Sequence, residues 1–379
     1  MVLLWMAMSE KVLRETPLHA ESAALGASFG EWFGCRLPSR YGEPGEEIAA
    51  ARQSVVFFDT NFRGFLSLAG PDRARYLNAV TTADIKNLAE GRGNVGLLLN
   101  PKGHILAEIE TYALAETLLL VTHASVLART QETLERFIIM DDCVMEDLSA
   151  RSGSLAVEGP GAGAVMESLC GVKADSLPAE AWSHIAAKIG GADCRLVMRS
   201  FYCGAGFEIF AETGQLGAIW RAVAALVKAQ GGRPIGYDAL NVLRLEAGIP
   251  WFGYDFDDRV LPQEAGVELT HISYTKGCYT GQEIVERVRS RGQVNRKRTM
   301  LIFHGAEIPA AGTMLMAGAA EAGVVTSAAF SPARGGGIGM GFVRREQSEP
   351  GARMTWPGGS AEVMGEQAGA EGQKLGGCA

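Results

Sequence analysis

The sequence predicts an α+β fold in which two α/β subdomains are followed by a small C-terminal β-barrel. The chain has 379 residues, which corresponds to two or three domains of ordinary size. A strand, a Gly-Pro turn and a helix start follow one another from Phe65, and the pattern recurs as LAVEGP from Leu155. After Arg298 the chain changes to short strand-like runs separated by Gly, Ala and Pro, which is typical of a small barrel or sandwich.

The composition indicates a globular protein of acidic character. Hydrophobic residues make up 47% and charged residues 21% of the chain, which excludes a mostly disordered or coiled-coil protein. Because 35 basic residues stand against 43 acidic ones, the net charge is -8, and nucleic acid is not an expected partner. The apolar opening Met1–Met8 is too short for a membrane span or a usual signal sequence, so we expect a cytoplasmic protein without a membrane partner.

The cysteine and histidine patterns do not predict a metal site. Seven cysteines occur without a C-x-x-C pair, and six histidines occur without an H-x-x-x-H pair. A disulfide framework, a zinc site and a self-contained iron–sulfur cluster are therefore not expected.

The first half of the chain predicts a small antiparallel sheet with helices on one side. The expected elements are the strand 65–69, the helix 72–79, a hairpin of strands 95–99 and 105–112, a strand at 118–122 and an amphipathic helix at 126–138. Alternation along the second hairpin strand places Ile105, Ala107 and Ile109 on one face and Glu108 on the other.

The second half predicts one more α/β unit and then the barrel strands. The expected elements are the strand 155–158, the helices 162–169 and 237–247, and the barrel strands 299–303, 313–316, 323–327, 338–343 and 354–356. Gly248 and Pro250 are expected to end the second of these helices. The glycine-rich run 334–341 is interpreted as a tight turn into a barrel strand, because no helix follows it to complete a phosphate loop.

The stretch KGCYTGQE, Lys276 to Glu283, is the most unusual in the sequence. Cys278 follows a glycine and a lysine, so an exposed turn with a nearby cation can lower the pKa of its thiol and make it reactive. The alternative is that Cys278 is a small buried hydrophobic residue.

A basic strip follows this stretch. Arg287, Arg289 and Arg291 alternate along a predicted strand, and residues 296–298 add three further basic side chains. Such a patch can hold a carboxylate-rich or phosphate-bearing ligand. The alternative is the solvated outer face of a strand.

Around a glycine-rich bend, Tyr202 precedes Glu208. A carboxylate can accept two N–H bonds from the edge of a pterin or purine while an aromatic side chain packs on the ring, so this bend can bind a flat heterocycle. The alternative is an exposed turn before a strand.

Several segments together resemble the folate-binding family that contains the glycine cleavage T-protein, an aminomethyltransferase, and the YgfZ-type proteins of iron–sulfur cluster maintenance. The early segments TPLHA from Thr16, EEIAAAR from Glu46 and FFDT from Phe57 resemble the T-protein N-terminus. The segments common to both branches are LSLAGPD, TTADI from Thr81, LNPKGHIL from Leu99 and ALNVLRLEAGIP from Ala239. LPQEAG followed by KGCYTGQE resembles the YgfZ-type branch, since T-proteins have no cysteine there.

The resemblance implies two α/β subdomains and a barrel around a central hole that admits tetrahydrofolate. The division expected on this basis is a first α/β subdomain formed by 1–50 with 150–250, a second at 51–149, a connecting segment at 251–297, the barrel at 298–365 and a frayed tail at 366–379.

The resemblance also implies roles for particular residues. Glu208 would hold the pterin with Tyr202 nearby, and Arg244, Gln282 and Arg287 would complete the folate site. The T-protein carries an essential acid in a G-x-x-D-D-L stretch, and the stretch from Gly103 aligns with it so that Glu108 takes the acidic position. One of the two acids is absent here, and Glu replaces Asp.

The function expected from this branch is tetrahydrofolate binding in support of iron–sulfur cluster assembly or repair. Cys278 would be the reactive group, aided by Lys276, and the partners would be reduced folate and iron–sulfur assembly proteins or client enzymes. The alternative is a folate-dependent aminomethyl- or methyltransferase that uses Glu108. A role in RNA modification is weaker, because the net charge is negative and aromatic residues do not interleave with the basic strip.

Overall fold

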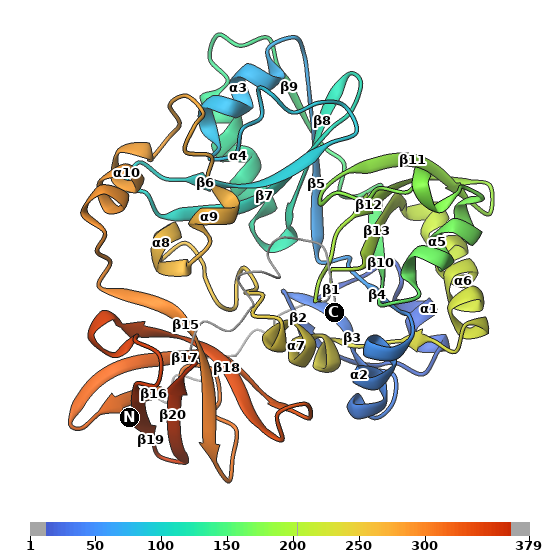
Figure 1. Cartoon of the computed structure of the whole chain (residues 1–379). Coiled ribbons are helices and arrows are strands. Elements are labelled where there is room, and N and C mark those ends of the chain that lie inside the picture. Colours follow the sequence, from blue (N-terminus) through green and yellow to red (C-terminus); the bar gives the residue numbers. More distant parts are fainter. Residues whose placement is uncertain (1–12, 203, 365–379) are drawn as a thin grey trace, which may run out of the picture.

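The computed structural model describes residues 13–202 and 204–364, and it arranges them in four sheets (Figure 1). The α+β architecture with a closed C-terminal barrel confirms the fold class predicted from the sequence. The expectations for Met1–Met8 and for 366–379 lie outside the described residues. Within those residues, no helix combines the length and the apolar character that a membrane crossing requires.

A six-stranded sheet of order β11-β12-β13-β10-β4-β14 forms the core of one subdomain. Its strands are β4 (Val56–Asp59), β10 (Ser152–Glu158), β11 (His184–Ile189), β12 (Ala192–Met198), β13 (Gly206–Glu212) and β14 (Arg233–Pro234). Helices α5 (Ala162–Cys170) and α6 (Thr213–Ala229) pack against it, and Trp220 of α6 meets Phe57 of β4 edge to face at 4.7 Å. The strand and helix predicted from Leu155 are thereby confirmed as β10 and α5.

A second core lies between this sheet and a three-stranded sheet of order β1-β3-β2. The elements are β1 (Arg14–Glu15), α1 (His19–Ala24), β2 (Ser28–Trp32), β3 (Cys35–Arg40), α2 (Pro44–Gln53) and α7 (Tyr237–Glu246). Leu37, Ile48 and Leu240 from β3, α2 and α7 share this core with Phe58 of β4. Residues far apart in the sequence therefore meet here to fix α7 and the chain that follows it.

The other subdomain is built on a five-stranded antiparallel sheet of order β6-β7-β8-β5-β9. Its elements are β5 (Arg63–Ala69), α3 (Arg73–Val80), β6 (Gly93–Leu99), β7 (Ile105–Ala113), β8 (Thr117–His123), η1 (Ala124–Val126), α4 (Leu127–Phe137) and β9 (Val144–Asp147). The alternation predicted for β7 is confirmed, because Ile105, Ala107 and Ile109 are buried and Glu108 is half-buried on the other face. The chain passes from one large sheet to the other between Asp59 and Arg63.

The barrel closes in the order β15-β18-β17-β16-β19-β20. Its strands are β15 (Arg296–Gly305), β16 (Met314–Ala317), β17 (Ala320–Ser331), β18 (Gly336–Arg344), β19 (Arg353–Trp356) and β20 (Gly359–Val363), with η3 (Arg345–Gln347) after β18. Because these six strands form a closed barrel, the alternative of a sandwich is excluded. The glycine-rich run enters β18 through a turn, as predicted, and Gly339 has no room for a Cβ because that atom would lie 2.1 Å from the carbonyl oxygen of Ser327.

The segment between α7 and the barrel contains three short helices, α8 (Pro262–Ala265), α9 (Glu268–His271) and α10 (Gln282–Arg291). The prediction of a strand through Arg287 and Arg289 is wrong, because both lie on α10. A period of two does not place side chains on one face of a helix, and among the side chains of α10 that the structure describes Val285 is the buried one. Arg289 instead forms a 3.5 Å ion pair with Glu286 one turn earlier.

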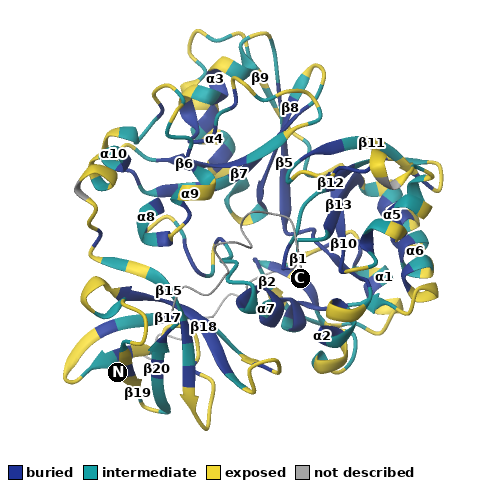
Figure 2. Cartoon of the chain, in the orientation of Figure 1, coloured by how far each residue is buried: buried dark blue, intermediate teal, exposed yellow. Residues whose placement is uncertain are grey.

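The two large sheets stand side by side, and Figure 2 shows buried residues along β5, β10 and β13, where they meet. Exposed residues gather on the outer helices and at the loop tips. The site described next lies at this junction. Short η2 (Ala174–Ser176) completes the elements and lies beside α5, away from the junction.

Candidate active site

Glu108 projects from the middle of β7 toward α9. Its Oε1 accepts a hydrogen bond from Nε2 of His271 at 2.8 Å, and its Oε2 lies 3.9 Å from Nε2 of His123 at the end of β8. On the other side of the His271 ring, Nδ1 lies 2.7 Å from the hydroxyl of Thr270. The carboxylate thus lies between two imidazole rings, His271 of α9 and His123 of β8.

Charge and burial determine the protonation states in this group. Burial alone would raise the pKa of Glu108, but the hydrogen bond and charge of His271, with smaller effects of His123 and Arg199, lower it to about 2. Burial also lowers the pKa of His123 to about 4, against the opposing charge of Glu108. Near neutral pH, Glu108 is therefore an ionised carboxylate beside a neutral His123.

A buried network of two arginines and two glutamates joins the two large sheets. Arg63 of β5 donates to Glu110 of β7 at 2.8 Å and to both carboxylate oxygens of Glu208 of β13 at 3.1 and 2.9 Å. Arg199 donates to Glu110 at 2.9 Å, and the Tyr112 hydroxyl donates to its other oxygen at 2.8 Å. Every carboxylate oxygen therefore has a donor, which is what a buried charge needs to be stable.

Aromatic rings line the neighbouring space and contact His123. Phe33 and Phe62 stack at 4.3 Å, and their ring centroids lie 5.3 and 5.1 Å from that of His123. Trp251 and Tyr254, which are only half-buried, continue this wall at 5.1 and 4.9 Å from Phe33. These half-exposed rings are linked to Glu108 through Phe33 and His123, and they form a surface on which a flat heterocycle can pack.

Glu208 and Tyr202 occupy buried positions with protein partners. Glu208 is fully buried, and Arg63 takes both of its oxygens. Tyr202 is buried against α2, where its hydroxyl donates to the carbonyl oxygen of Ala51 at 3.3 Å. The alternative of an exposed turn before β13 is therefore wrong for Tyr202. The role of Tyr202 toward folate stays a prediction.

Arg244 on α7 braces the loop that carries Trp251. Its guanidinium donates to Asn241 at 2.8 and 3.0 Å and pairs with buried Asp255. The same guanidinium lies 4.5 Å from the centre of the Trp251 ring, a cation–π contact. Arg244 thus positions an aromatic residue of the wall, and its direct approach to folate stays a prediction.

Lys276 is used as a structural clamp. Its ammonium group donates to the carbonyl oxygens of Asn78, Thr81 and Ala83 at 2.5, 2.5 and 2.7 Å. These are all the protons that a lysine can donate. Burial lowers the pKa of Lys276 to about 8, with a smaller opposing effect of Asp84. The geometry gives Lys276 the task of holding the end of α3, and it does not support activation of Cys278.

Cys278 is exposed, so the alternative of a buried hydrophobic cysteine is wrong. Gln282 accepts a hydrogen bond from the backbone N–H of Tyr279 at 3.3 Å, and Arg287 is exposed on α10. Figure 1 places this turn and α10 at the far end of the β6–β7 hairpin. Among the described residues, no hydrogen bond or ion pair directly joins Cys278, Gln282 or Arg287 to Glu108, and their shared role stays a prediction.

The sequence reasoning missed Arg63, Glu110, His123 and His271. The sequence contained a pattern that could have indicated Glu110, because this residue follows Glu108 by two positions on the same face of a largely apolar strand. No local pattern could have indicated His271, since it contacts Glu108 across 163 positions of sequence.

Comparisons with known proteins agree with this architecture. The GCVT N-terminal domain matches residues 18–273, and the glycine cleavage T-protein C-terminal barrel domain matches residues 296–365. A protein named aminomethyltransferase from Saccharopolyspora erythraea is 30% identical over 343 residues, covering 90% of this chain and 93% of the relative. Another with this name, from Streptomyces coelicolor, is 30% identical over 349 residues, covering 91% and 93%.

A solved structure has the same fold. The glycine cleavage system aminomethyltransferase T from Bartonella henselae superposes with a TM-score of 0.84 at 24% identity, covering 94% of this chain and 98% of that one. The two domain matches together span both subdomains and the barrel, and the relatives align over nine-tenths of the chain. These matches establish the family. The chain belongs to the glycine cleavage T-protein (GCVT) family.

Proposed function

We propose that this protein is a folate-dependent aminomethyl- or methyltransferase that uses tetrahydrofolate as the acceptor of the one-carbon unit. The observation that carries the proposal is Glu108, an ionised and half-buried carboxylate fixed by His271 beside an aromatic wall. Relatives named aminomethyltransferase that align along nearly the whole chain support it.

The described residues suit a reduced folate. Trp251 and Tyr254 can pack on the flat pterin, and folate supplies the amine that takes up the one-carbon unit. A bound folate would form the new nitrogen–carbon bond while the bond from that carbon to its donor breaks, with the electron pair leaving on the donor, so positive charge would develop on the folate nitrogen. A pKa of about 2 keeps Glu108 ionised near neutral pH, so Glu108 would stabilise this charge electrostatically, and the proton released by the nitrogen would pass to solvent.

In this proposal Glu208 acts on the ligand through Arg63 rather than by direct contact. Its carboxylate orients the Arg63 guanidinium, and Arg63 in turn holds Glu110 next to Glu108 on β7. Glu208 is therefore a positioning residue.

A second candidate function is support of iron–sulfur cluster assembly through Cys278. The exposure of this thiol within KGCYTGQE favours it, because an accessible thiol can exchange ligands with a partner protein. The relatives do not carry this assignment in their names, so we place it after the transferase.

The test is product analysis with tetrahydrofolate and an aminomethyl or methyl donor. Glu108→Gln should retain folate affinity in titration calorimetry and lose about a hundredfold in the rate of transfer, as for other charge-stabilising groups. Glu116→Gln, an exposed glutamate at the β7–β8 turn, is the matched control and should behave as wild type. Absence of folate binding, or full transfer by Glu108→Gln, would contradict the proposal.

A further inference from the structure

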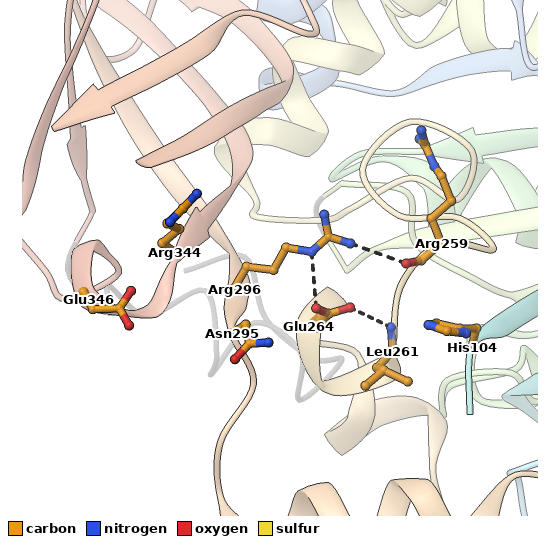
Figure 3. A pocket seen from close by; sticks show the side chains of 8 residues that line it. All are labelled: His104, Arg259, Leu261, Glu264, Asn295, Arg296, Arg344 and Glu346. Carbon is orange, nitrogen blue, oxygen red and sulfur yellow. Dashed lines mark hydrogen bonds and ion pairs between the residues drawn. The ribbon is translucent and has the colours of Figure 1, made fainter. Parts of the chain in front are cut away.

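A recess lies between the barrel, the β6–β7 turn and the segment before α8 (Figure 3). Its volume is about 650 Å³, and three arginines line it, namely Arg259, Arg296 and Arg344. His104 lines the opposite side, and Glu264 and Glu346 are the acidic residues of the lining. This recess is separate from the junction of the two large sheets that carries Glu108.

Two of these arginines are placed against each other by the barrel itself. Arg296 at the start of β15 pairs in register with Arg344 at the end of β18, so the two side chains leave the sheet on the same face. Directly opposite residues have Cβ atoms about 4.5–5.5 Å apart, and like charges in such pairs destabilise a sheet. A negative group between the two guanidinium groups would remove this repulsion.

The protein supplies only part of that negative charge. Glu264 accepts from Nε of Arg296 at 3.2 Å, and Nη2 of Arg296 donates to the carbonyl oxygen of Arg259 at 3.4 Å. These bonds fix the Arg296 plane, and none of the bonds between the residues drawn in Figure 3 uses its Nη1. The side chain of Arg344 is exposed and makes no ion pair with any residue that the structure describes.

The other charges of the lining are already engaged nearby. Asp257 pairs with Arg259, and Arg345 lies 3.9 Å from Glu346. Arg344 is therefore the arginine of the lining that makes no ion pair with a described residue, while Arg296 is held by Glu264 and can present its remaining N–H groups to a ligand. Guanidinium groups are suited to bind phosphate or carboxylate oxygens.

We propose that this recess binds a small ligand with two or more anionic oxygen groups, phosphates or carboxylates, and that Arg296 and Arg344 form the clamp. The inference does not depend on the transferase proposal, since no residue of the recess belongs to the Glu108 group. Because the clamp belongs to the barrel and His104 to the β6–β7 turn, the bound anion would also stabilise the contact between barrel and subdomain.

The experiment is titration calorimetry and thermal melting of the full chain with two probes, tripolyphosphate and citrate, at constant ionic strength. We expect saturable binding and a raised melting temperature. Arg344→Ala should weaken binding by about tenfold or more, the usual effect of losing a charge-assisted hydrogen bond. The probe that binds more tightly identifies the preferred anionic group, phosphate or carboxylate.

Two further variants make the test specific. Glu264→Gln keeps one acceptor oxygen in place of the two that bond Arg296 and the backbone N–H of Leu261, and it removes the competing negative charge, so it should tighten anion binding. Arg353→Ala removes an exposed barrel arginine far from the recess and should bind both probes as wild type does. The proposal is overturned if neither probe saturates, if Arg344→Ala binds as wild type, or if Arg353→Ala weakens binding equally.

Discussion

The sheet junction around Arg63 and the turn KGCYTGQE both contain charged side chains, and the fold uses these charges differently. At the junction, buried arginine and glutamate side chains satisfy one another across β5, β7 and β13. In the turn, the cation of Lys276 is satisfied by backbone carbonyls, and Cys278 is left exposed beside it. Charged side chains therefore bind one another in the buried junction, whereas the charged side chain of the turn binds the backbone and leaves the neighbouring thiol accessible.

The largest expected effect tests the junction. Arg63→Ala removes three hydrogen bonds from buried Glu110 and Glu208 and leaves Arg199 as a charged neighbour of both, so the free energy of unfolding should fall by about 3–5 kcal/mol. Urea denaturation measures this loss. Arg353→Ala, an exposed arginine on the barrel, should change the same quantity by no more than about 0.5 kcal/mol. A loss below about 1 kcal/mol for Arg63→Ala would show that the network is not needed to join the sheets.

The second prediction concerns the acid sensitivity of the junction. His123 has a pKa of about 4 in the folded protein and about 6.5 when unfolded, so the unfolded chain binds the extra proton as the pH falls below 6.5. Its contribution to stability is therefore fully present above pH 6.5 and is lost down to about pH 4. By linkage the loss approaches about 3 kcal/mol.

His123→Gln should flatten the dependence of the unfolding free energy on pH between 6.5 and 4. His184, whose pKa burial also lowers to about 4, provides the comparison, because His184→Gln should flatten the same range by acting outside the Glu108 group. An unchanged slope for His123→Gln would mean that its imidazole accepts a proton in the folded state as readily as in the unfolded state.

The contrast between the two regions also explains what the sequence could predict. Local patterns predicted the barrel, the β7 alternation and the helix at α7, because these depend on neighbours within a few residues. The partners of Lys276 could not be predicted, since the carbonyl of Asn78 is 198 positions away. Arg63 was missed for the same reason, as its bond to Glu208 spans 145 positions. The α10 strand prediction failed because a mostly solvated segment has no buried face to impose a period.

The smallest expected effect tests the turn. Cys278→Ser changes an exposed side chain by little volume, so the melting temperature should stay within about 1–2 °C of wild type, and folate affinity should be unchanged. Lys276→Met should lower stability, because three carbonyl oxygens lose their donor, while the rate of Cys278 alkylation stays near that of wild type. A steep fall in that rate would instead assign Lys276 to thiol activation. If Cys278→Ser restores iron–sulfur enzyme activity fully in a strain lacking the protein, the thiol is not needed for that activity.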